Sequence, residues 1–226
     1  MKYYDKIMKC LYGRNIYADF NQNAFNLDLQ RWGSTHPVFS RAVQLVRPKL
    51  IIEIGSWKGA SAIHTAQFLD PDSVIICVDT WLGTINNFLG QDGIEGDSLN
   101  RHNGYPSLYF QFLANVVLSG VSDKIIPLPQ TSNNGAAILT KLGLKPDLIY
   151  LDGSHEIMDV YQDLCNYYPL LTNEGLLIGD DFNRESVKTA VYLFKKNSGV
   201  TIYAHENKFI VFKKRRYAFS GFKEIL

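Results

Sequence analysis

Three aspartates stand at the ends of two short apolar runs, and they are the residues of this chain best suited to chemistry. Asp152 follows residues 147–151, and Asp180 with Asp181 follows residues 175–178. If both runs are neighbouring parallel strands, their carboxyl ends meet at one edge of the sheet. Carboxylates that close repel one another unless a cation or protons intervene, and oxygen ligands suit Mg²⁺. The spacing predicts a divalent metal, Mg²⁺ first among the choices, on Asp152, Asp180 and Asp181.

A histidine follows this cluster, and simpler interpretations of the cluster itself stay open. His155, three residues after Asp152, could accept a proton from a hydroxyl near pH 7 as neutral imidazole, or could only orient that hydroxyl. The pair at 180–181 could merely cap a helix that begins near Glu185, and Asp152 could serve only the amino group of a cofactor.

A glycine turn follows an earlier β-branched run at residues 49–54. Gly55 permits a tight turn, Gly59 permits close packing at a helix start, and free backbone N–H groups there attract an anion. One strand-helix unit later, Asp79 ends the next strand, where an acid can accept hydrogen bonds from both hydroxyls of a ribose. A plain turn between strand and helix is the alternative. Trp57 replaces the middle glycine of the dinucleotide pattern, which favours a nucleoside without pyrophosphate.

Residues 50–62, LIIEIGSWKGASA, resemble the first motif of the class I S-adenosylmethionine-dependent methyltransferases. Within that class the chain is similar to the metal-dependent small-molecule O-methyltransferases of the catechol, caffeoyl and macrolide-sugar type. Their fourth and fifth strands end in an Asp and in an Asp followed by Asp or Asn, as here at positions 152, 180 and 181. The resemblance covers about residues 49–183 and leaves out the first 45 residues and the segment 81–106.

The resemblance implies roles for individual residues. The glycine turn and Ser61 would hold the methionine carboxylate and amine, Asp79 the ribose, and Thr131 with Ser132 would flank the adenine. His155 stands where catechol and caffeoyl relatives carry a lysine. The implied catalytic residues are Asp152 and His155. The implied cofactor-binding residues are Glu53, Gly55, Ser56, Trp57, Gly59, Ser61, Asp79, Thr80, Thr131, Ser132 and Asp152.

The implied reaction is transfer of a methyl group from S-adenosylmethionine to a hydroxyl of a small molecule, such as a sugar, a phenol or a natural product. The acceptor oxygen attacks the methyl group in line, and His155 or Asp152 takes the proton. Two other functions stay open: an NAD-type oxidoreductase on a similar sheet and a non-catalytic nucleoside-binding module. Trp57 disfavours the first, and the joint presence of the carboxylates, the turn and Asp79 disfavours the second.

The elements that must position these residues alternate between strand and helix patterns. The fold class is therefore α/β, and the resemblance implies a Rossmann-like, doubly wound, mostly parallel seven-stranded sheet with an antiparallel C-terminal hairpin. Strands are predicted at 49–54, 73–78, 124–128, 147–151, 175–178, 200–204 and 208–213, and helices at 60–69, 109–119, 134–142, 157–171 with an interruption near Pro169, and 187–196. We expect one structural domain, with a partly helical extension over 1–45 and a methyltransferase domain over 46–226.

Three further features carry expectations. The segment 81–106 is rich in glycine but interleaved with apolar residues, and we interpret it as a lid over the substrate, with a plain surface insertion as the alternative. Lys58, in the glycine turn, is expected to face solvent. The basic run 213–216 is expected to be an exposed strand end, because nucleic-acid binding normally draws on a wider patch.

The composition argues against several classes of protein. The 226 residues carry 23 Lys+Arg against 22 Asp+Glu, a net charge of +1, which does not favour nucleic acid or an anionic membrane as partner. The three cysteines form no CxxC pair, which argues against a disulfide framework or a zinc knuckle. No apolar run approaches the about 20 residues of a membrane span. We expect a soluble cytoplasmic protein. A homodimer is common among the enzymes that it resembles.

Overall fold

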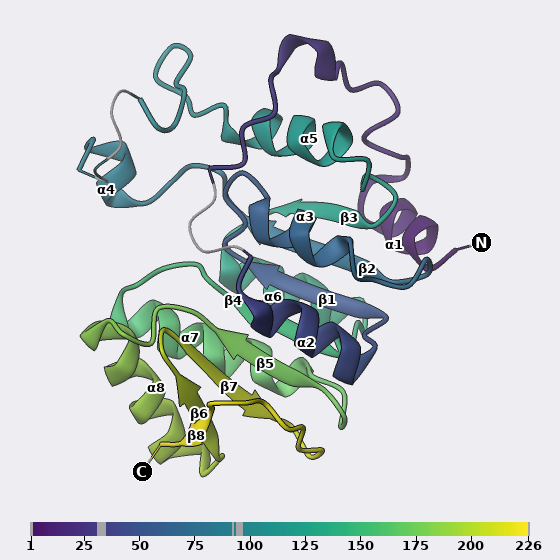
Figure 1. Ribbon diagram of the computed structural model, residues 1–226. Coiled ribbons are helices and arrows are strands. Elements are labelled where there is room, and N and C mark those ends of the chain that lie inside the picture. The colour runs from purple at the N-terminus through teal and green to yellow at the C-terminus, as the bar shows by residue number, and fades with distance from the viewer. Residues whose placement is uncertain (1, 31–34, 92, 94–96, 226) are drawn as a thin grey trace.

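The computed structural model describes residues 2–30, 35–91, 93 and 97–225, and within them the chain folds around one eight-stranded sheet (Figure 1). The strand order is β3-β2-β1-β4-β5-β7-β6-β8. The first five strands pair in parallel and the others are antiparallel. The strands are β1 (Leu50–Ile54), β2 (Val74–Asp79), β3 (Ile125–Pro129), β4 (Leu148–Leu151), β5 (Leu176–Gly179), β6 (Ile202–His205), β7 (Lys208–Phe212) and β8 (Lys223–Glu224).

Helices cover both faces of the sheet. They are α1 (Tyr3–Tyr12), α2 (Pro37–Val46), α3 (Ala60–Ala66), α4 (Ile85–Phe88), α5 (Leu108–Leu118), α6 (Ser132–Lys141), α7 (Ile157–Tyr167) and α8 (Glu185–Ser198), with 3₁₀ turns at Gln22–Ala24 and Tyr168–Leu170. The chain winds from β1 toward β3 on one side and from β4 toward β5 on the other. Right-handed crossovers therefore place α3 and α7 on opposite faces. None of the described helices combines the length and apolar composition needed to cross a bilayer.

The central strands are buried along their length because both faces are covered. Every residue of β1, β4 and β5 is buried, as expected for short parallel strands without polar alternation. Residues of the N-terminal helices join the same core: Ile7 and Met8 come from α1, and Phe39 of α2 stands edge-on to Tyr150 at a centroid distance of 4.7 Å. The connections leave β1 and β4 in opposite directions, which opens a crevice at their carboxyl ends.

The predicted α/β class, the mostly parallel sheet and the C-terminal hairpin are confirmed, and the predicted number of strands is wrong. The eighth strand, Lys223–Glu224, pairs antiparallel with Tyr203 and Ala204 of β6. A strand of two residues is too short to show a hydrophobic period, so the sequence pattern could not indicate it. The predicted break near Pro169 is present, because α7 ends at Tyr167 and a 3₁₀ turn follows.

Candidate active site

The glycine turn joins β1 to α3 and requires glycine for two physical reasons. Gly55 has φ +80°, and a Cβ there would overlap the backbone carbonyl of Asp152, because β4 runs directly beside β1. Gly59 has φ +87°, and a Cβ there would lie 3.0 Å from the ring of Phe112 on α5. The turn therefore lies against the start of the loop that carries Asp152 and His155.

Asp79, at the end of β2, fixes the backbone of the turn by accepting hydrogen bonds. Its Oδ2 accepts hydrogen bonds from the backbone N–H groups of Ser56 at 2.9 Å and Trp57 at 2.8 Å, and its Oδ1 accepts one from Trp81 at 2.7 Å. Burial raises the pKa of Asp79, although these backbone donors oppose the shift. Asp79, the predicted ribose ligand, is thus already engaged in fixing the backbone that a cofactor would approach.

A pair of buried polar atoms lies unpartnered beside the turn. Glu53 is 2% exposed, and its Oε1, like Oγ of Ser56, has no hydrogen-bond partner among the described residues. Burial, with a smaller contribution from the charge of Asp79, raises the pKa of Glu53 to about 7. Buried polar atoms are rarely left without partners in folded proteins. A ligand that brings a donor and an acceptor, as an amino acid moiety does, would complete this pair.

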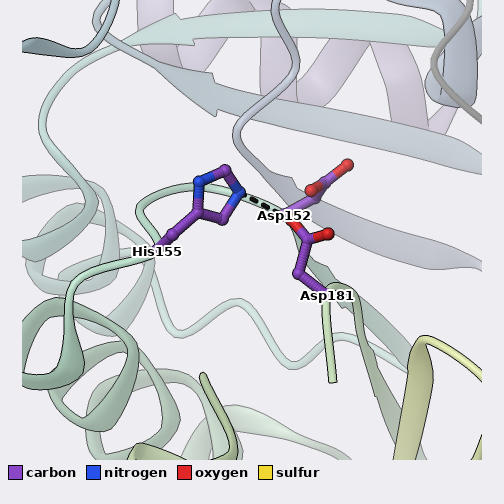
Figure 2. Close-up of side chains that lie close together, drawn as sticks. All are labelled: Asp152, His155 and Asp181. Atoms are coloured by element: carbon purple, nitrogen blue, oxygen red, sulfur yellow. Dashed lines mark ion pairs between the residues drawn. The ribbon is translucent and has the colours of Figure 1, made fainter. Parts of the chain in front are cut away.

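The carboxylate cluster lies at the ends of β4 and β5. One ligand atom each of Asp152, His155 and Asp181 lies within 4.8 Å of the other two (Figure 2), and Nε2 of His155 is 2.6 Å from Oδ2 of Asp181. Burial and the charge of Asp180 raise the pKa of Asp152. Burial alone would raise the pKa of Asp181 too, but His155 and Arg184 hold it below its ordinary value.

Asp180 lies beside this cluster, because the hydroxyl of Tyr150 contacts both Asp152, at 2.9 Å, and Asp180, but its own carboxylate is fully engaged. Its carboxylate forms an ion pair with the buried Lys208 and accepts hydrogen bonds from the hydroxyl of Tyr150 at 2.5 Å, the amide of Asn207 at 2.9 Å and the backbone N–H of Asp181 at 2.7 Å. A carboxylate offers about four lone-pair directions. Of the three predicted metal ligands, the structure brings Asp152 and Asp181 together, and His155 takes the place predicted for Asp180.

Lys208 is the residue of this site that the sequence did not indicate. Its side chain is 2% exposed and lies about equally far from the rings of Phe39 and Tyr150, at 6.0 and 5.9 Å. A lysine that begins a strand next to a polar turn is normally a solvated strand end. The only available signal was its position before the apolar residues 209–212.

The two aspartates after β5 do not cap the following helix through their side chains. The N-cap residue of α8 is Arg184, which makes no side-chain cap, and Asp181 contributes only its backbone carbonyl, to Arg184 N–H at 2.8 Å. Asp181 has φ +55°, a left-handed conformation that costs free energy in a residue with a Cβ. The helix-cap interpretation therefore does not account for these side chains.

The residues predicted to flank the adenine lie at the start of α6. Thr131 is the N-cap, with its hydroxyl accepting from Asn134 N–H at 3.3 Å, and the hydroxyl of Ser132 donates to the buried Asp163. Burial raises the pKa of Asp163 to about 6. Thr80 lies next to Asp79, and its hydroxyl accepts from Leu82 N–H at 3.2 Å.

Lys58 does not face solvent, contrary to the expectation from the sequence, because an N-terminal segment crosses the glycine turn. The side chain of Lys58 is 12% exposed and pairs with Asp28 of that segment at 2.5 Å. The fully buried Asn115 donates to the backbone carbonyls of Asp28 at 2.6 Å and of Lys58 at 2.8 Å. Trp57 Nε1 donates to Gln30 at 3.2 Å. These contacts join residues far apart in sequence, which no local pattern indicates.

The segment 81–106 has a buried base and an apolar outer surface; positions 92 and 94–96 of it lie outside the described residues. Trp81 is 2% exposed, and its Nε1 donates to the carbonyl of Trp57 at 2.7 Å, which ties the segment to the glycine turn. In Figure 1, α4 stands apart from the other labelled helices. The large apolar side chains exposed here are Leu82, Ile85, Phe88, Leu89 and Tyr105.

Comparison with known proteins agrees with this geometry. The family described as a methyltransferase domain matches residues 52–182, more than half of the chain, and the chain belongs to this family. The predicted class I methyltransferase family and fold are thereby confirmed. The match argues against an NAD-type oxidoreductase. A search of curated proteins found no match.

Solved structures of O-methyltransferases share the fold across nearly the whole chain. NovP superposes with a TM-score of 0.62 at 19% identity, covering 94% of this chain and 98% of NovP. TomG of Streptomyces achromogenes, an enzyme of tomaymycin synthesis solved with SAM, gives 0.59 at 14% identity, covering 92% and 93%. An O-methyltransferase of Bacillus cereus solved with SAH gives 0.58 at 12% identity, covering 92% and 94%. At these identities the likeness shows the fold.

Proposed function

We propose that this protein transfers a methyl group from S-adenosylmethionine to a hydroxyl of a small molecule, with a divalent cation at the acceptor. The observation that carries the proposal is the cluster of Asp152, His155 and Asp181 next to the glycine turn. A methyl donor on the turn and a hydroxyl at the cluster would meet at the carboxyl ends of β1, β4 and β5. Holding two reactants in one crevice supplies much of the acceleration in such a transfer.

Two of the residues assigned to the cofactor carry buried polar atoms that a bound cofactor would pair with. Glu53 Oε1 and Ser56 Oγ lack partners within the part of the chain that the structure describes, and the amino and carboxylate groups of a methionine moiety would supply them. Asp79 keeps the backbone of the turn in place and offers its remaining lone pairs to a ribose. When bound, S-adenosylmethionine supplies an electrophilic methyl group on a sulfonium centre. Thr131 and Ser132, at the start of α6, stay assigned to the adenine side.

The cation site is assigned to Asp152, His155 and Asp181. Two carboxylates and an imidazole are ligands that Mg²⁺ and Mn²⁺ accept. Ligand atoms around Mg²⁺ stand about 3–4 Å apart, so the three atoms, which lie within 4.8 Å, need only a small closing movement. A cation there would act as a Lewis acid on the acceptor hydroxyl. Lys208 compensates the charge of Asp180, and a cation would favour the ionised form of Asp152, which burial and Asp180 disfavour.

His155 could instead act as the general base, a role that its contact with Asp181 favours. Its 2.6 Å hydrogen bond to Asp181 is the arrangement in which a carboxylate orients an imidazole and stabilises the imidazolium that forms on proton uptake. Ligation through Nε2 excludes that hydrogen bond. Metal dependence therefore separates the two roles.

The acceptor surface is assigned to the segment 81–106. Its exposed side chains Ile85, Phe88 and Leu89 are apolar, which favours an acceptor with an aromatic or aliphatic body beside its hydroxyl. This assignment keeps the predicted role of the segment as a lid over the substrate.

A binding and turnover assay tests the proposal. S-adenosylhomocysteine is titrated into EDTA-treated protein, and S-adenosylmethionine is then incubated with a panel of catechols and sugars that carry vicinal hydroxyls. The expected result is saturable binding, and methylated product that requires Mg²⁺ or Mn²⁺. Absence of S-adenosylhomocysteine binding in folded protein would overturn the proposal in favour of a binding module for another ligand.

The variant His155→Gln decides between the two roles of the histidine, with His205→Gln on the hairpin as matched control. If His155 is a ligand, the concentration of Mg²⁺ at half-maximal rate rises at least tenfold and the shape of the pH profile is kept. If His155 is the base, activity needs no metal and the variant loses the acidic limb of the pH-rate profile.

A further inference from the structure

A second hollow lies at the opposite edge of the sheet, where the run 213–216 leaves β7. Its volume is about 160 Å³, and it is lined by Tyr168, Tyr203, Phe212, Lys213, Lys214 and Arg216, together with two residues that precede β6. This is less than the roughly 300–1,000 Å³ of sites for drug-sized ligands, so the hollow suits a small polar group. The basic run is thus part of the wall of a concavity, and is more than the exposed strand end that the sequence indicated.

The positive charge of this hollow is not neutralised by the chain. Among the described residues, Lys213, Lys214 and Arg216 form no salt bridge, and neither does the nearby Lys145. The pKa of Lys213 is lowered by burial and by the like charges of Lys145 and Lys214. Like charges held together without counter-ions are a cost that an anionic ligand would remove.

Two acidic residues of this region, Glu174 and Asp147, are already engaged. Glu174 pairs with Arg215 at 2.9 Å, outside the lining of the hollow. Asp147 accepts hydrogen bonds from the backbone N–H groups of Lys49 and Leu50 and from the hydroxyl of Thr172. Neither carboxylate is paired with a cation that lines the hollow.

Aromatic rings and backbone contact two of the three cations. Nζ of Lys213 donates to the carbonyl of Tyr168 at 3.2 Å and lies 4.2 Å from the centre of its ring. The guanidinium of Arg216 lies 6.0 Å from the centre of the Tyr203 ring, and Tyr203 in turn packs against Phe212 at 5.5 Å. Positioned cations on a firm aromatic wall lose less conformational freedom on binding than free lysines do.

This hollow is separate from the candidate active site. Lys208 begins β7 beside Asp180, and Lys213 follows its other end, five residues later. At about 3.4 Å per residue, an antiparallel strand carries the chain roughly 17 Å over that distance. A ligand bound here does not lie against the carboxylate cluster or the glycine turn.

We propose that the hollow bounded by Lys213, Lys214 and Arg216 binds a small phosphorylated ligand, with its phosphate groups on the three cations and its body against Tyr203 and Phe212. Three cations match a phosphate ester or diphosphate, which carries two to three negative charges, better than a single carboxylate does. Guanidinium and ammonium groups are the side chains that bind phosphate oxygens in proteins. The concave, limited extent of the lining favours a small molecule over a polyanionic strand.

Titration of inorganic pyrophosphate tests the proposal. The calorimetric measurement uses the full chain in EDTA with saturating S-adenosylhomocysteine, which occupies the proposed cofactor turn and leaves the second hollow free. We expect one saturable site, and a dissociation constant raised at least tenfold in Lys214→Ala/Arg216→Ala. Both side chains are exposed, so melting temperature should stay within the usual small range for surface changes. Acetate at the same ionic strength should not compete.

The matched control is Lys6→Ala/Lys9→Ala, which removes the same charge from exposed positions of α1. Equal weakening in both double variants would overturn the proposal, because it would show that only net charge attracts the anion. Absence of pyrophosphate binding would also overturn it. So would tighter, Lys214-dependent binding of an oligonucleotide or of phosphatidylserine vesicles, which would make the surface a site for a larger partner. Each result is independent of methyl transfer.

Discussion

The glycine turn and the carboxylate cluster lie in the same crevice, but their acidic side chains differ in how many hydrogen-bond donors they already have. The oxygens of Asp79 are engaged by three backbone N–H groups of the turn and its surroundings. Asp152 accepts one hydrogen bond, from the hydroxyl of Tyr150 at 2.9 Å, and Asp181 contacts His155 and Arg184. Together with His155, these two acids lie where a cation can join them. An acid held by several backbone donors maintains the shape of the turn, whereas acids with fewer partners can still bind a ligand.

Asp180 shows that neighbouring carboxylates can belong to different categories. It directly precedes Asp181, but its four donors, Lys208 among them, make it a structural acid like Asp79. Its hydrogen bond from the Asp181 N–H also holds the left-handed backbone of that residue. Substitutions that remove one acid, or the partner of one acid, should separate effects on stability from effects on activity.

The largest effect is expected for Asp152→Asn, which removes the charge of a proposed ligand but keeps a side-chain oxygen that can accept from the hydroxyl of Tyr150. We expect kcat/KM for methyl transfer to fall about 10⁴-fold. The melting temperature should be unchanged or higher, because burial and Asp180 penalise the ionised form of Asp152, whose pKa they raise. Steady-state assays with thermal melts measure both. A large loss of stability would show that Asp152 is structural like Asp79.

Lys208→Met should destabilise the fold most. It leaves the buried charge of Asp180 without its cation, a change that costs about 3–5 kcal/mol in other proteins. Urea denaturation measures it. The double variant Lys208→Met/Asp180→Asn should recover most of that loss, because it removes both charges. If the single and double variants are equally unstable, packing and not charge explains the role of Lys208.

Asp79→Ala should weaken structure and cofactor binding together, because the turn loses its acceptor. Three backbone N–H groups lose their partner, and we expect a loss of about 2–3 kcal/mol in stability. The dissociation constant of S-adenosylhomocysteine should rise about 100-fold, as measured by calorimetry. Asp72→Ala, an exposed acid before β2, is the control. Unchanged cofactor affinity would remove Asp79 from the proposed site.

The smallest effect concerns pH. The pKa of Glu53 is raised to about 7 by burial, and a cofactor ammonium would bind its ionised form. Affinity for S-adenosylhomocysteine should therefore fall roughly tenfold for each pH unit below 7 and level off above it. Calorimetry between pH 5.5 and about 8.5 follows this dependence. Glu53→Gln should bind more weakly at pH 8 and lose the dependence; a slope that persists in the variant contradicts the role of Glu53.

The order of strands and helices could be predicted because each parallel strand is apolar on both faces and ends at a turn residue. Predicted strand limits such as 49–54 and 147–151 differ from the observed limits by one residue. The two-residue β8 left no such pattern. Asp79, Asp152 and Asp181 could be placed at one edge for the same reason, because the carboxyl ends of parallel strands meet.

Sequence alone thus determined the sheet, the turn that needs Gly55 and the edge at which the acids gather, since these follow from local backbone conformation and burial. Only the tertiary structure decided which acids are fully paired and which can still accept a ligand. Lys208 reaches Asp180 from β7, Asn115 joins Asp28 to Lys58, and His155 meets Asp181 across two loops. Pairing of this kind depends on side-chain positions brought together from distant segments, and hydrophobic periodicity carries no information about it.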